Sequence, residues 1–367
     1  MPTLFDPVTA GDLQLPNRIV MAPLTRNRAP DALPTPLMAE YYTQRASAGL
    51  LITEATAISH QAQGYSDVPG LYGSEQLDGW KRITQSVHEA GGRIVVQLWH
   101  VGRISHTDLQ PEGGKPVAPS AITAKTKTVL IKDGVPAFVD TSEPRALDAG
   151  ELPGIVHTFQ AAARNAVETA GFDGVEIHAA NGYLLDQFLK DGSNKRIDDY
   201  GGSIENRARL TLEITRSIAD AIGGGKVGIR LAPVTPANDA HDSDPQSLFD
   251  YLVRELATLN LAYLHIIEGA TGGPRSIDDR PFDYAALKSA YRQAGGKGAW
   301  MVNNGYEQAL AEKAVADGAD LVAFGRPYIG NPDLVERLHQ SAPLVKSDKT
   351  TWYGGGAKGY TDYPTLQ

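Results

Sequence analysis

The 367-residue chain contains no cysteine, and this absence alone excludes several kinds of site. Disulfides, thiolate nucleophiles, cysteine-ligated zinc and iron–sulfur clusters all need that side chain. The chain also lacks an excess of basic residues, because its formal net charge is −9 at pH 7. Nucleic acids and anionic membranes attract basic surfaces, so we expect neither as a partner.

Long apolar runs and linkers are missing as well. No run approaches the roughly 18 apolar residues of a membrane span, and Met1–Asp6 does not resemble the start of a secretory signal. No run of like charges and no low-complexity stretch divides the chain. We therefore expect a cytoplasmic protein with a single domain over residues 1–367, a length that is common for an α/β barrel with insertions.

Short apolar, β-branched runs recur along the chain, and most are followed by a stretch of helical periodicity. Continuous apolar runs are typical of strands buried on both faces, as in parallel sheets. Eight such units predict a closed (β/α)8 barrel, also called a TIM barrel. The predicted strands are Arg18–Thr25, Leu50–Ile58, Arg93–His100, Asp173–Ala180, Lys226–Pro233, Tyr263–Gly269, Trp300–Gly305 and Leu321–Pro327. The predicted helices are Ser74–Ala90, Ile155–Ala170, Ser203–Ile222, Pro245–Leu259, Tyr306–Asp317 and Asn331–Gln340.

Two segments interrupt this pattern. Leu4–Pro16 precedes the first strand, and its central turn predicts a hairpin at the floor of the barrel. Val101–Leu147 follows the third strand and contains Asp133-Gly134 between alternating segments, which indicates a two-residue hairpin turn. Because loops that follow barrel strands lie at the C-terminal face, we expect residues 101–147 to cap the active site.

Several familiar motifs fail on inspection. The spacing G-x-G-x-x-G occurs at residues 223–228 and 354–359, but neither copy follows a predicted strand and opens a helix, as a dinucleotide fingerprint must. Asp239, Asp242 and Asp244 lie near His241 without the glycine of a calcium loop. We favour an acidic loop there and predict no metal site.

The ends of the last two predicted strands carry glycine and arginine. Gly305 and Gly325 let backbone N–H groups approach a phosphate closely, and Arg326 adds positive charge. Glycine at a strand end also serves tight turns, but the arginine that follows favours phosphate binding.

The fourth predicted strand leads into a loop with three hydrogen-bonding side chains, His178, Asn181 and Tyr183. His178 and Asn181 can donate to one carbonyl oxygen and stabilise a developing enolate. A tyrosine with an ordinary pKa of about 10 is protonated at neutral pH, so Tyr183 can supply a proton. The alternative is a loop of unrelated polar residues.

Two polar residues fall inside otherwise apolar strands. Arg230 interrupts Val227–Leu231, and a buried charge needs a partner. Glu176, Glu268 or an anionic cofactor atom could fill that role. Gln97 offers a donor and an acceptor, which suits the imide edge of a ligand.

Together these residues resemble the Old Yellow Enzyme family of flavoproteins, and the resemblance covers essentially the whole chain. Its most specific part runs through Gly174–Leu184, Asp186–Leu189 and Tyr200–Ser203. The start, Asn17–Arg26, and the tail, Tyr353–Pro364, resemble the branch that includes the bacterial N-ethylmaleimide and nitrate-ester reductases.

The resemblance implies an FMN-dependent ene-reductase that reduces activated C=C bonds of α,β-unsaturated carbonyls, maleimides and nitro compounds. FMN would be bound tightly but not covalently, with NADPH as reductant and NADH as the alternative. The reductant would leave before the substrate binds at the same place. Hydride would come from flavin N5 and the proton from Tyr183. The expected partners are small molecules, and the expected state is a monomer or weak homodimer.

The resemblance also assigns roles residue by residue. Thr25 would bind flavin O4, Gln97 the pyrimidine edge, and Arg230 the region of N1 and O2. Further cofactor contacts would come from Pro23, Ala57, Asn304, Gly305, Gly325, Arg326 and Trp352. The activating oxygen of the substrate would be bound by His178 and Asn181, and the pocket walls would be formed by Tyr65, Trp99 and Tyr353.

Three other interpretations compete with this one. A dienoyl-CoA reductase-like enzyme carries an iron–sulfur cluster and a further dinucleotide domain, and we expect neither in a chain without cysteine. A flavin-binding sensor or storage protein would need no proton donor, whereas this chain has Tyr183. A metal- or Schiff-base-dependent barrel enzyme would need a ligand cluster, which is not recognised, or a reactive lysine.

Overall fold

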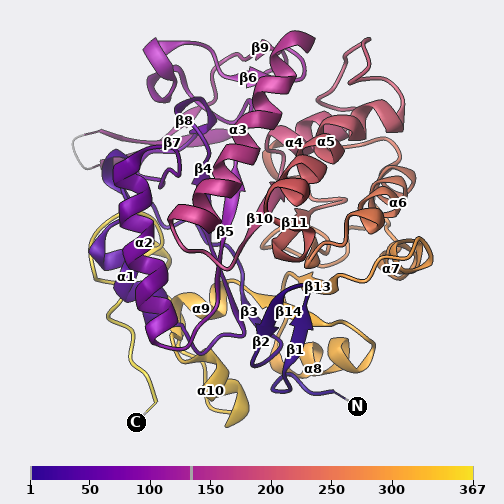
Figure 1. Ribbon diagram of the computed structural model, residues 1–367. Helices are drawn as coiled ribbons and strands as arrows, with labels where there is room; N and C mark the ends of the chain where they lie inside the picture. The colour runs from indigo at the N-terminus through magenta and orange to yellow at the C-terminus, as the bar shows by residue number, and fades with distance from the viewer. Residues whose placement is uncertain (1, 133–134, 367) are drawn as a thin grey trace.

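Eight parallel strands close into a barrel in the computed structural model, which describes residues 2–132 and 135–366 (Figure 1). The strand order around the barrel is β10-β11-β12-β13-β14-β3-β4-β5. Every residue of these strands is buried, since helices cover the outer face and side chains fill the interior. The predicted (β/α)8 barrel is confirmed. The barrel strands are β3 (Ile19–Met21), β4 (Leu50–Ala57), β5 (Ile94–Trp99), β10 (Gly174–Ala179), β11 (Val227–Leu231), β12 (Tyr263–Ile267), β13 (Ala299–Asn303) and β14 (Leu321–Phe324).

The helices include all six predicted segments, with shifted ends. Asp148 N–H donates to the Glu151 carboxylate over 2.8 Å just before α3, as a capping box requires. The predicted helix at residues 155–170 is α3 followed by a π-helical turn at Asn165–Thr169. Helices α1, α4, α7 and α9 were not predicted; α4 and α9 are too short to show a helical period. The helices are α1 (Pro36–Thr43), α2 (Ser74–Glu89), α3 (Leu152–Arg164), α4 (Leu184–Leu189), α5 (Ile204–Ile222), α6 (Pro245–Leu256), α7 (Tyr284–Gln293), α8 (Gln308–Ala316), α9 (Arg326–Gly330) and α10 (Leu334–His339).

The floor of the barrel is closed by the predicted N-terminal hairpin. Strands β1 (Val8–Ala10) and β2 (Leu13–Leu15) pair antiparallel beneath the barrel (Figure 1). Their buried side chains pack in one cluster with Val20 and Met301 from the barrel interior. The turn is fixed by Asp12 N–H, which donates to Gly225 O over 2.8 Å. The lower part of the barrel is therefore an apolar core, which leaves the upper part for a site.

The segment 101–147 leaves the barrel after β5, and its described residues carry four short strands. Strands β6 (Val117–Ala118) and β9 (Arg145–Ala146) pair with each other, and β7 (Lys127–Lys132) and β8 (Val135–Asp140) form an antiparallel hairpin. The turn predicted at Asp133-Gly134 lies outside the described residues. Val129 and Phe138, on the two strands of this hairpin, line the pocket at the C-terminal face of the barrel.

Among residues 2–132 and 135–366, no helix is both long and apolar enough to cross a bilayer.

Candidate active site

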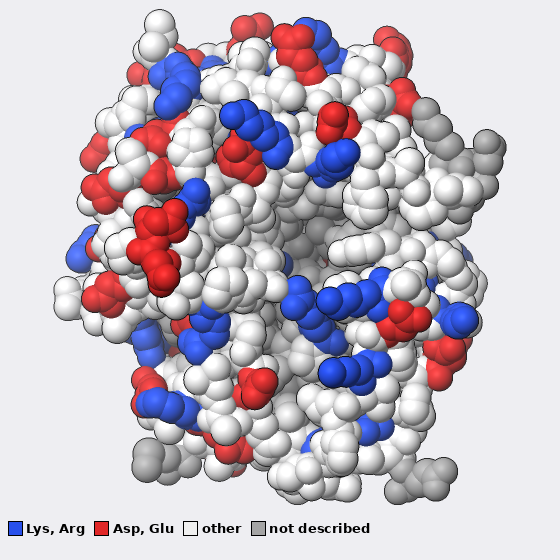
Figure 2. Space-filling model, turned by 180° about the vertical axis from the view of Figure 1, so that it is seen from behind, with Lys and Arg blue, Asp and Glu red and all other residues white. Residues whose placement is uncertain are grey.

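A cavity of about 590 Å³ opens where the barrel strands end. Figure 2 shows the face turned away from the viewer in Figure 1; it is hollowed near its centre, and Lys and Arg side chains lie along the rim of the hollow. A basic rim favours an anionic ligand. With the exception of Ala57, every residue that the sequence assigned to the site lines this cavity. These residues are Pro23, Thr25, Tyr65, Gln97, Trp99, His178, Asn181, Tyr183, Arg230, Asn304, Gly305, Gly325, Arg326, Trp352 and Tyr353.

Ala57 does not line the cavity, whereas Ala55 does, and the predicted cofactor contact of Ala57 stays a prediction. Strand β4 also contains a bulge ahead of both alanines: Ile52 pairs with Val95, but Ala55 pairs with Gln97, so β4 has one extra residue. The backbone of Ala57 is also occupied, since its N–H donates to Pro69 O over 2.9 Å.

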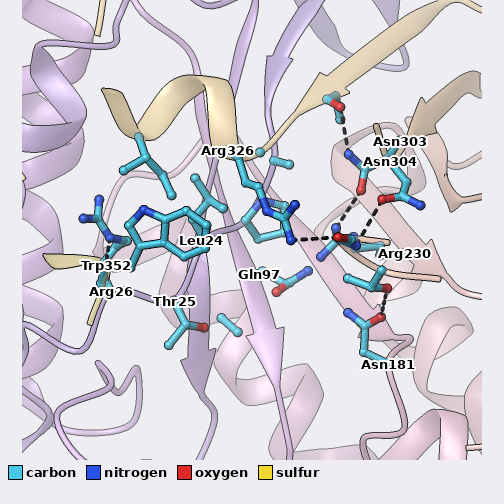
Figure 3. Close-up of a pocket in the computed structure, with 18 of the residues that line it drawn as sticks. Leu24, Thr25, Arg26, Gln97, Asn181, Arg230, Asn303, Asn304, Arg326 and Trp352 are labelled. Carbon is cyan, nitrogen blue, oxygen red and sulfur yellow. Dashed lines mark hydrogen bonds between the residues drawn. The ribbon is translucent and has the colours of Figure 1, made fainter. Parts of the chain in front are cut away.

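Thr25 lies on the loop after β3 and not within the predicted strand. The strand itself ends at Met21, and residues 22–27 continue along the wall of the cavity. Thr25 is half-buried there. Arg26 anchors the end of this loop to the C-terminal tail, because its Nε donates to Trp352 O over 2.7 Å. Figure 3 shows Thr25, Arg26 and Trp352 together on one side of the pocket.

The opposite side of the pocket carries Arg230, whose partner differs from both expected carboxylates. Arg230 Nη2 donates to Asn303 Oδ1 over 2.8 Å, at the end of β13 (Figure 3). Glu268 instead accepts from Arg275 Nε over 3.0 Å. Burial lowers the pKa of Arg230, but a guanidinium stays protonated in proteins. A positive charge therefore lies at the pocket wall with only neutral Asn303 as a direct partner among the described residues.

The sequence did not identify Asn303 as a site residue. The side chain of its neighbour Asn304 bonds to the backbone of the loop after β12 and not to the cavity. Asn304 Nδ2 donates to Glu268 O over 2.6 Å and to Ala270 O over 2.9 Å. Its Oδ1 accepts from Gly272 N over 3.1 Å. The side chain thus organises the loop after β12, and only the backbone of Asn304 is left for the predicted cofactor contact.

The glycines and arginine expected to bind phosphate lie together above β13 and β14. Gly325 directly precedes α9, and Gly305 has a φ of 66°, a conformation in which a side chain would be strained. Arg326 Nη2 donates to Gly272 O over 2.7 Å, which holds the guanidinium at the pocket rim. Its Cζ lies 5.7 Å from the centre of the Trp352 ring. The other four of its five N–H groups bond to no described residue and can donate to an anion.

Asn181 is oriented by a residue that the sequence did not point to. Thr271 Oγ1 donates to Asn181 Oδ1 over 2.6 Å (Figure 3). Since the amide oxygen is engaged, the Nδ2 group is the part of the side chain left to donate to a ligand. Asn181 has a φ of 59°, which asparagine tolerates better than most residues. The loop thereby presents a hydrogen-bond donor to the cavity.

Removing this orientation should weaken substrate binding. In Thr271→Val the amide of Asn181 is free to rotate, and we expect KM for 2-cyclohexenone to rise about two- to tenfold, the value of one neutral hydrogen bond. Thr271→Ser keeps the hydroxyl and is the matched control. Steady-state kinetics on both variants decide the matter: an unchanged KM in Thr271→Val would show that Thr271 does not orient Asn181.

Tyr183 is enclosed by aromatic rings. Its ring packs edge-to-face on Trp99, with centroids 4.9 Å apart, and on His178, also 4.9 Å away. The hydroxyl groups of Tyr183 and Tyr65 lie 3.1 Å apart and share a hydrogen bond. Burial raises the pKa of Tyr183, so it carries its proton across the neutral range. Burial and then the charge of Arg230 place the pKa of His178 well below its usual value, so its ring is neutral.

Buried neutral histidines make stability depend on pH. Burial lowers the pKa of His100 to about 3, whereas in the unfolded chain it is about 6.5. Below that value the unfolded state binds a proton that the native state does not, so stability falls as pH falls. Relative to His100→Asn, wild type should lose about 2 kcal/mol of unfolding free energy between pH 7 and pH 5. Urea titrations of both holoenzymes at the two pH values measure this difference; parallel losses would contradict it.

These features define a class of protein. The cavity offers an amide suited to an imide edge (Gln97), a buried guanidinium (Arg230), and two glycines with an arginine suited to phosphate (Gly305, Gly325 and Arg326). This donor set fits FMN, which has both an imide edge and a phosphate. A protonated tyrosine, Tyr183, lies beside it together with the polar side chains of His178 and Asn181. A (β/α)8 barrel with such a pocket is a flavin-binding oxidoreductase.

Comparisons with known proteins agree. The model of the NADH:flavin oxidoreductase / NADH oxidase family matches residues 3–344. A structure of morphinone reductase in complex with tetrahydroNAD is 47% identical, with a TM-score of 0.94 and coverage of 100% of this chain and 98% of its own. The Old Yellow Enzyme homologue from Zymomonas mobilis is 43% identical, with a TM-score of 0.93 and complete coverage of both chains. The 12-oxophytodienoate reductase 1 of Oryza sativa subsp. japonica is 44% identical over 99% of this chain and 93% of its own.

The chain therefore belongs to the NADH:flavin oxidoreductase family and, within it, to the Old Yellow Enzyme ene-reductases, as the sequence resemblance predicted. It is an FMN-dependent enzyme that takes electrons from a nicotinamide nucleotide.

Proposed function

We propose that this enzyme reduces the C=C bond of α,β-unsaturated carbonyl compounds, with Tyr183 as proton donor and with His178 and Asn181 as the groups that bind the carbonyl oxygen. The observation that carries this proposal is the arrangement of the three side chains around one cavity. Tyr183 retains its proton, the His178 ring is neutral, and Thr271 leaves Asn181 Nδ2 as donor. Maleimides and nitroalkenes share the feature that matters, an oxygen conjugated to the double bond.

The residues of the site divide the work. A bound FMN would supply the hydride-transfer chemistry between the nicotinamide and the β carbon of the alkene. His178 and Asn181 hold the oxygen and stabilise the negative charge that builds on it, which lowers the barrier because these bonds strengthen in the transition state. Tyr183 then transfers its hydroxyl proton to the α carbon. Tyr65 lies within hydrogen-bond distance of Tyr183 and is half-buried, so it can return a proton from solvent.

The cofactor would be held by both ends of the pocket. Gln97 and Arg230 would bind the pyrimidine end, Thr25 would donate to flavin O4, and Arg326 with the neighbouring glycines would bind the phosphate. Pro23 and Trp352 would complete the walls. We propose NADPH as the preferred reductant, with the basic rim of the hollow as the feature that favours its additional phosphate.

Steady-state kinetics test this proposal. One cavity serves both the nicotinamide and the alkene, so the two should react in turn, and double-reciprocal plots with 2-cyclohexenone should give parallel lines. NADPH should give a higher kcat/KM than NADH. Intersecting lines would show that both substrates bind together and would contradict the shared site. Better use of NADH would overturn the proposed preference and leave the rest intact.

A further inference from the structure

A buried carboxylate lies directly beneath the pocket. Glu176 on β10 pairs in register with Gln97 on β5, and its side chain points into the barrel. Glu176 and His265, on β12, are both fully buried, and neither lines the cavity. They form a polar layer between the apolar floor, to which Met301 belongs, and the pocket above. A carboxylate in such a place is costly unless its oxygens are engaged.

Both oxygens of Glu176 are engaged, and one of them by Gln97. Gln97 Nε2 donates to Glu176 Oε1 over 2.8 Å. The reverse orientation of the amide would bring Gln97 Oε1 against Glu176 Oε1, which places two acceptors in contact. Gln97 therefore keeps its nitrogen on Glu176. Its oxygen, which bonds to no other described residue, and its second N–H are left for the pocket.

His265 fixes the other oxygen. Its Nδ1 lies 2.8 Å from Glu176 Oε2. Burial lowers the pKa of His265, so the ring is neutral and carries one proton. A carboxylate can only accept a hydrogen bond, so the ring nitrogen that faces Glu176 must donate. We therefore assign the proton of the His265 ring to Nδ1 from these hydrogen-bond partners. Glu176 is thus held from both sides, and its rotation, which would release Gln97, is blocked.

We propose that Glu176 and His265 are positioning residues that lock the Gln97 amide in the one orientation that matches the imide edge of FMN. A free amide oxygen accepts from an imide N–H, and the remaining amide N–H donates to the adjacent carbonyl. The dyad never touches the cofactor; it acts through Gln97. Cofactor affinity and the hydrogen bond at flavin N3 then depend on a carboxylate one layer below the site.

The test uses holoenzyme loaded with oxidised FMN that carries ¹⁵N at N3. In wild type, the N3–H signal in the NMR spectrum should lie downfield and exchange slowly with water. In Glu176→Gln the partner of Gln97 is no longer an obligate acceptor, so the amide can turn over. We expect the N3–H signal to move upfield and exchange faster, and the Kd for FMN to rise about two- to tenfold, as for the loss of one neutral hydrogen bond. A wild-type N3–H signal and Kd in Glu176→Gln would overturn the proposal.

Two further comparisons separate orientation from general stability. His265→Asn retains a donor near the position of Nδ1 and should keep the N3–H signal at its wild-type position. His265→Leu, of similar size, has no donor and should shift the signal as Glu176→Gln does. If Glu176→Gln does not fold, this pair of variants tests the proposal in its place. Thr53→Val removes a buried hydrogen bond of 3.2 Å to the backbone N–H of Gln97, and it should lower Tm without moving the N3–H signal. Equal spectra for Asn and Leu at position 265 would also overturn the proposal.

The inference rests on the FMN site and not on the proposed substrate. No alkene or nicotinamide is present in the experiment, so a failed ene-reductase assay leaves its result intact. Conversely, an unaltered N3–H signal in the variants would leave the roles of Tyr183 and His178 untouched.

Discussion

Replacing Tyr183 with phenylalanine is expected to slow the reduction of 2-cyclohexenone by about 10²- to 10⁴-fold, the range for loss of a general acid. The reduction of FMN by NADPH should remain close to the wild-type rate, because hydride transfer to the flavin needs no proton from this residue. The substitution removes one oxygen and leaves the ring in its contacts with Trp99 and His178. Stopped-flow measurement of each half-reaction separates the two rates.

Tyr65→Phe provides the matched control for this prediction. It removes the hydroxyl that lies 3.1 Å from Tyr183, so the two variants lose the same hydrogen bond. Tyr65→Phe keeps the donor itself and should retain most of the rate at which the alkene reoxidises the flavin. If Tyr183→Phe impaired both half-reactions equally, or no more than Tyr65→Phe, Tyr183 would not be the proton donor.

Replacing His178 with alanine should weaken ligands that place an oxyanion in the pocket. A phenolate such as that of 4-hydroxybenzaldehyde would accept a charge-assisted hydrogen bond from the imidazole, and loss of such a bond corresponds to about a 10- to 100-fold rise in Kd. The same change should lower kcat for 2-cyclohexenone, since the bond strengthens as charge develops. Titration of the visible flavin spectrum with the phenol measures the affinity.

Asn181→Ala is the companion variant, because it removes the second proposed donor from the same ligand oxygen. We expect a smaller loss of affinity, since Asn181 also bonds to Thr271 near the exposed rim. Unchanged phenol binding in His178→Ala would refute the role of His178, whatever the result for Asn181. Loss of bound FMN in either variant would show that the residue supports the cofactor instead.

The barrel and most of the site could be predicted because they depend on local signals. Strands buried on both faces have continuous apolar runs, and the polar residues that end them stand out against that background. His178, Asn181 and Tyr183 could be found in this way, as could Arg230 within β11. The glycines next to Arg326 could be found for the same reason.

What could not be predicted depends on register or on contacts between distant segments. Ala55 lines the cavity and Ala57 does not, and nothing in the eight residues of β4 distinguishes the two alanines. Asn303 and Asn304 are adjacent and chemically alike, so the sequence does not show which of them faces Arg230. In the structure β13 ends at Asn303, which accepts from Arg230, and the backbone turns at Asn304, whose φ is 102°. Thr271 reaches Asn181 across 90 positions of sequence.

The cap shows the same limit. The pattern of β7 and β8 predicts a hairpin, but the arrival of Val129 and Phe138 at the pocket depends on how the segment 101–147 folds back over the barrel. The sequence could not decide whether Arg230 pairs with Glu176, with Glu268 or with an anionic cofactor atom. An isolated charge in an apolar strand indicates that a partner exists, but it does not show where that partner lies.

The most direct test of the account is an anaerobic spectral titration of the purified protein. We expect the absorption bands of bound oxidised FMN, their bleaching on addition of NADPH, and their return when 2-cyclohexenone is added. These spectral changes would establish both electron entry from the nicotinamide and electron exit to an alkene. Bands that bleach but do not return with the enone would contradict the proposed reaction and favour a flavoprotein that binds or senses redox cofactors without reducing alkenes.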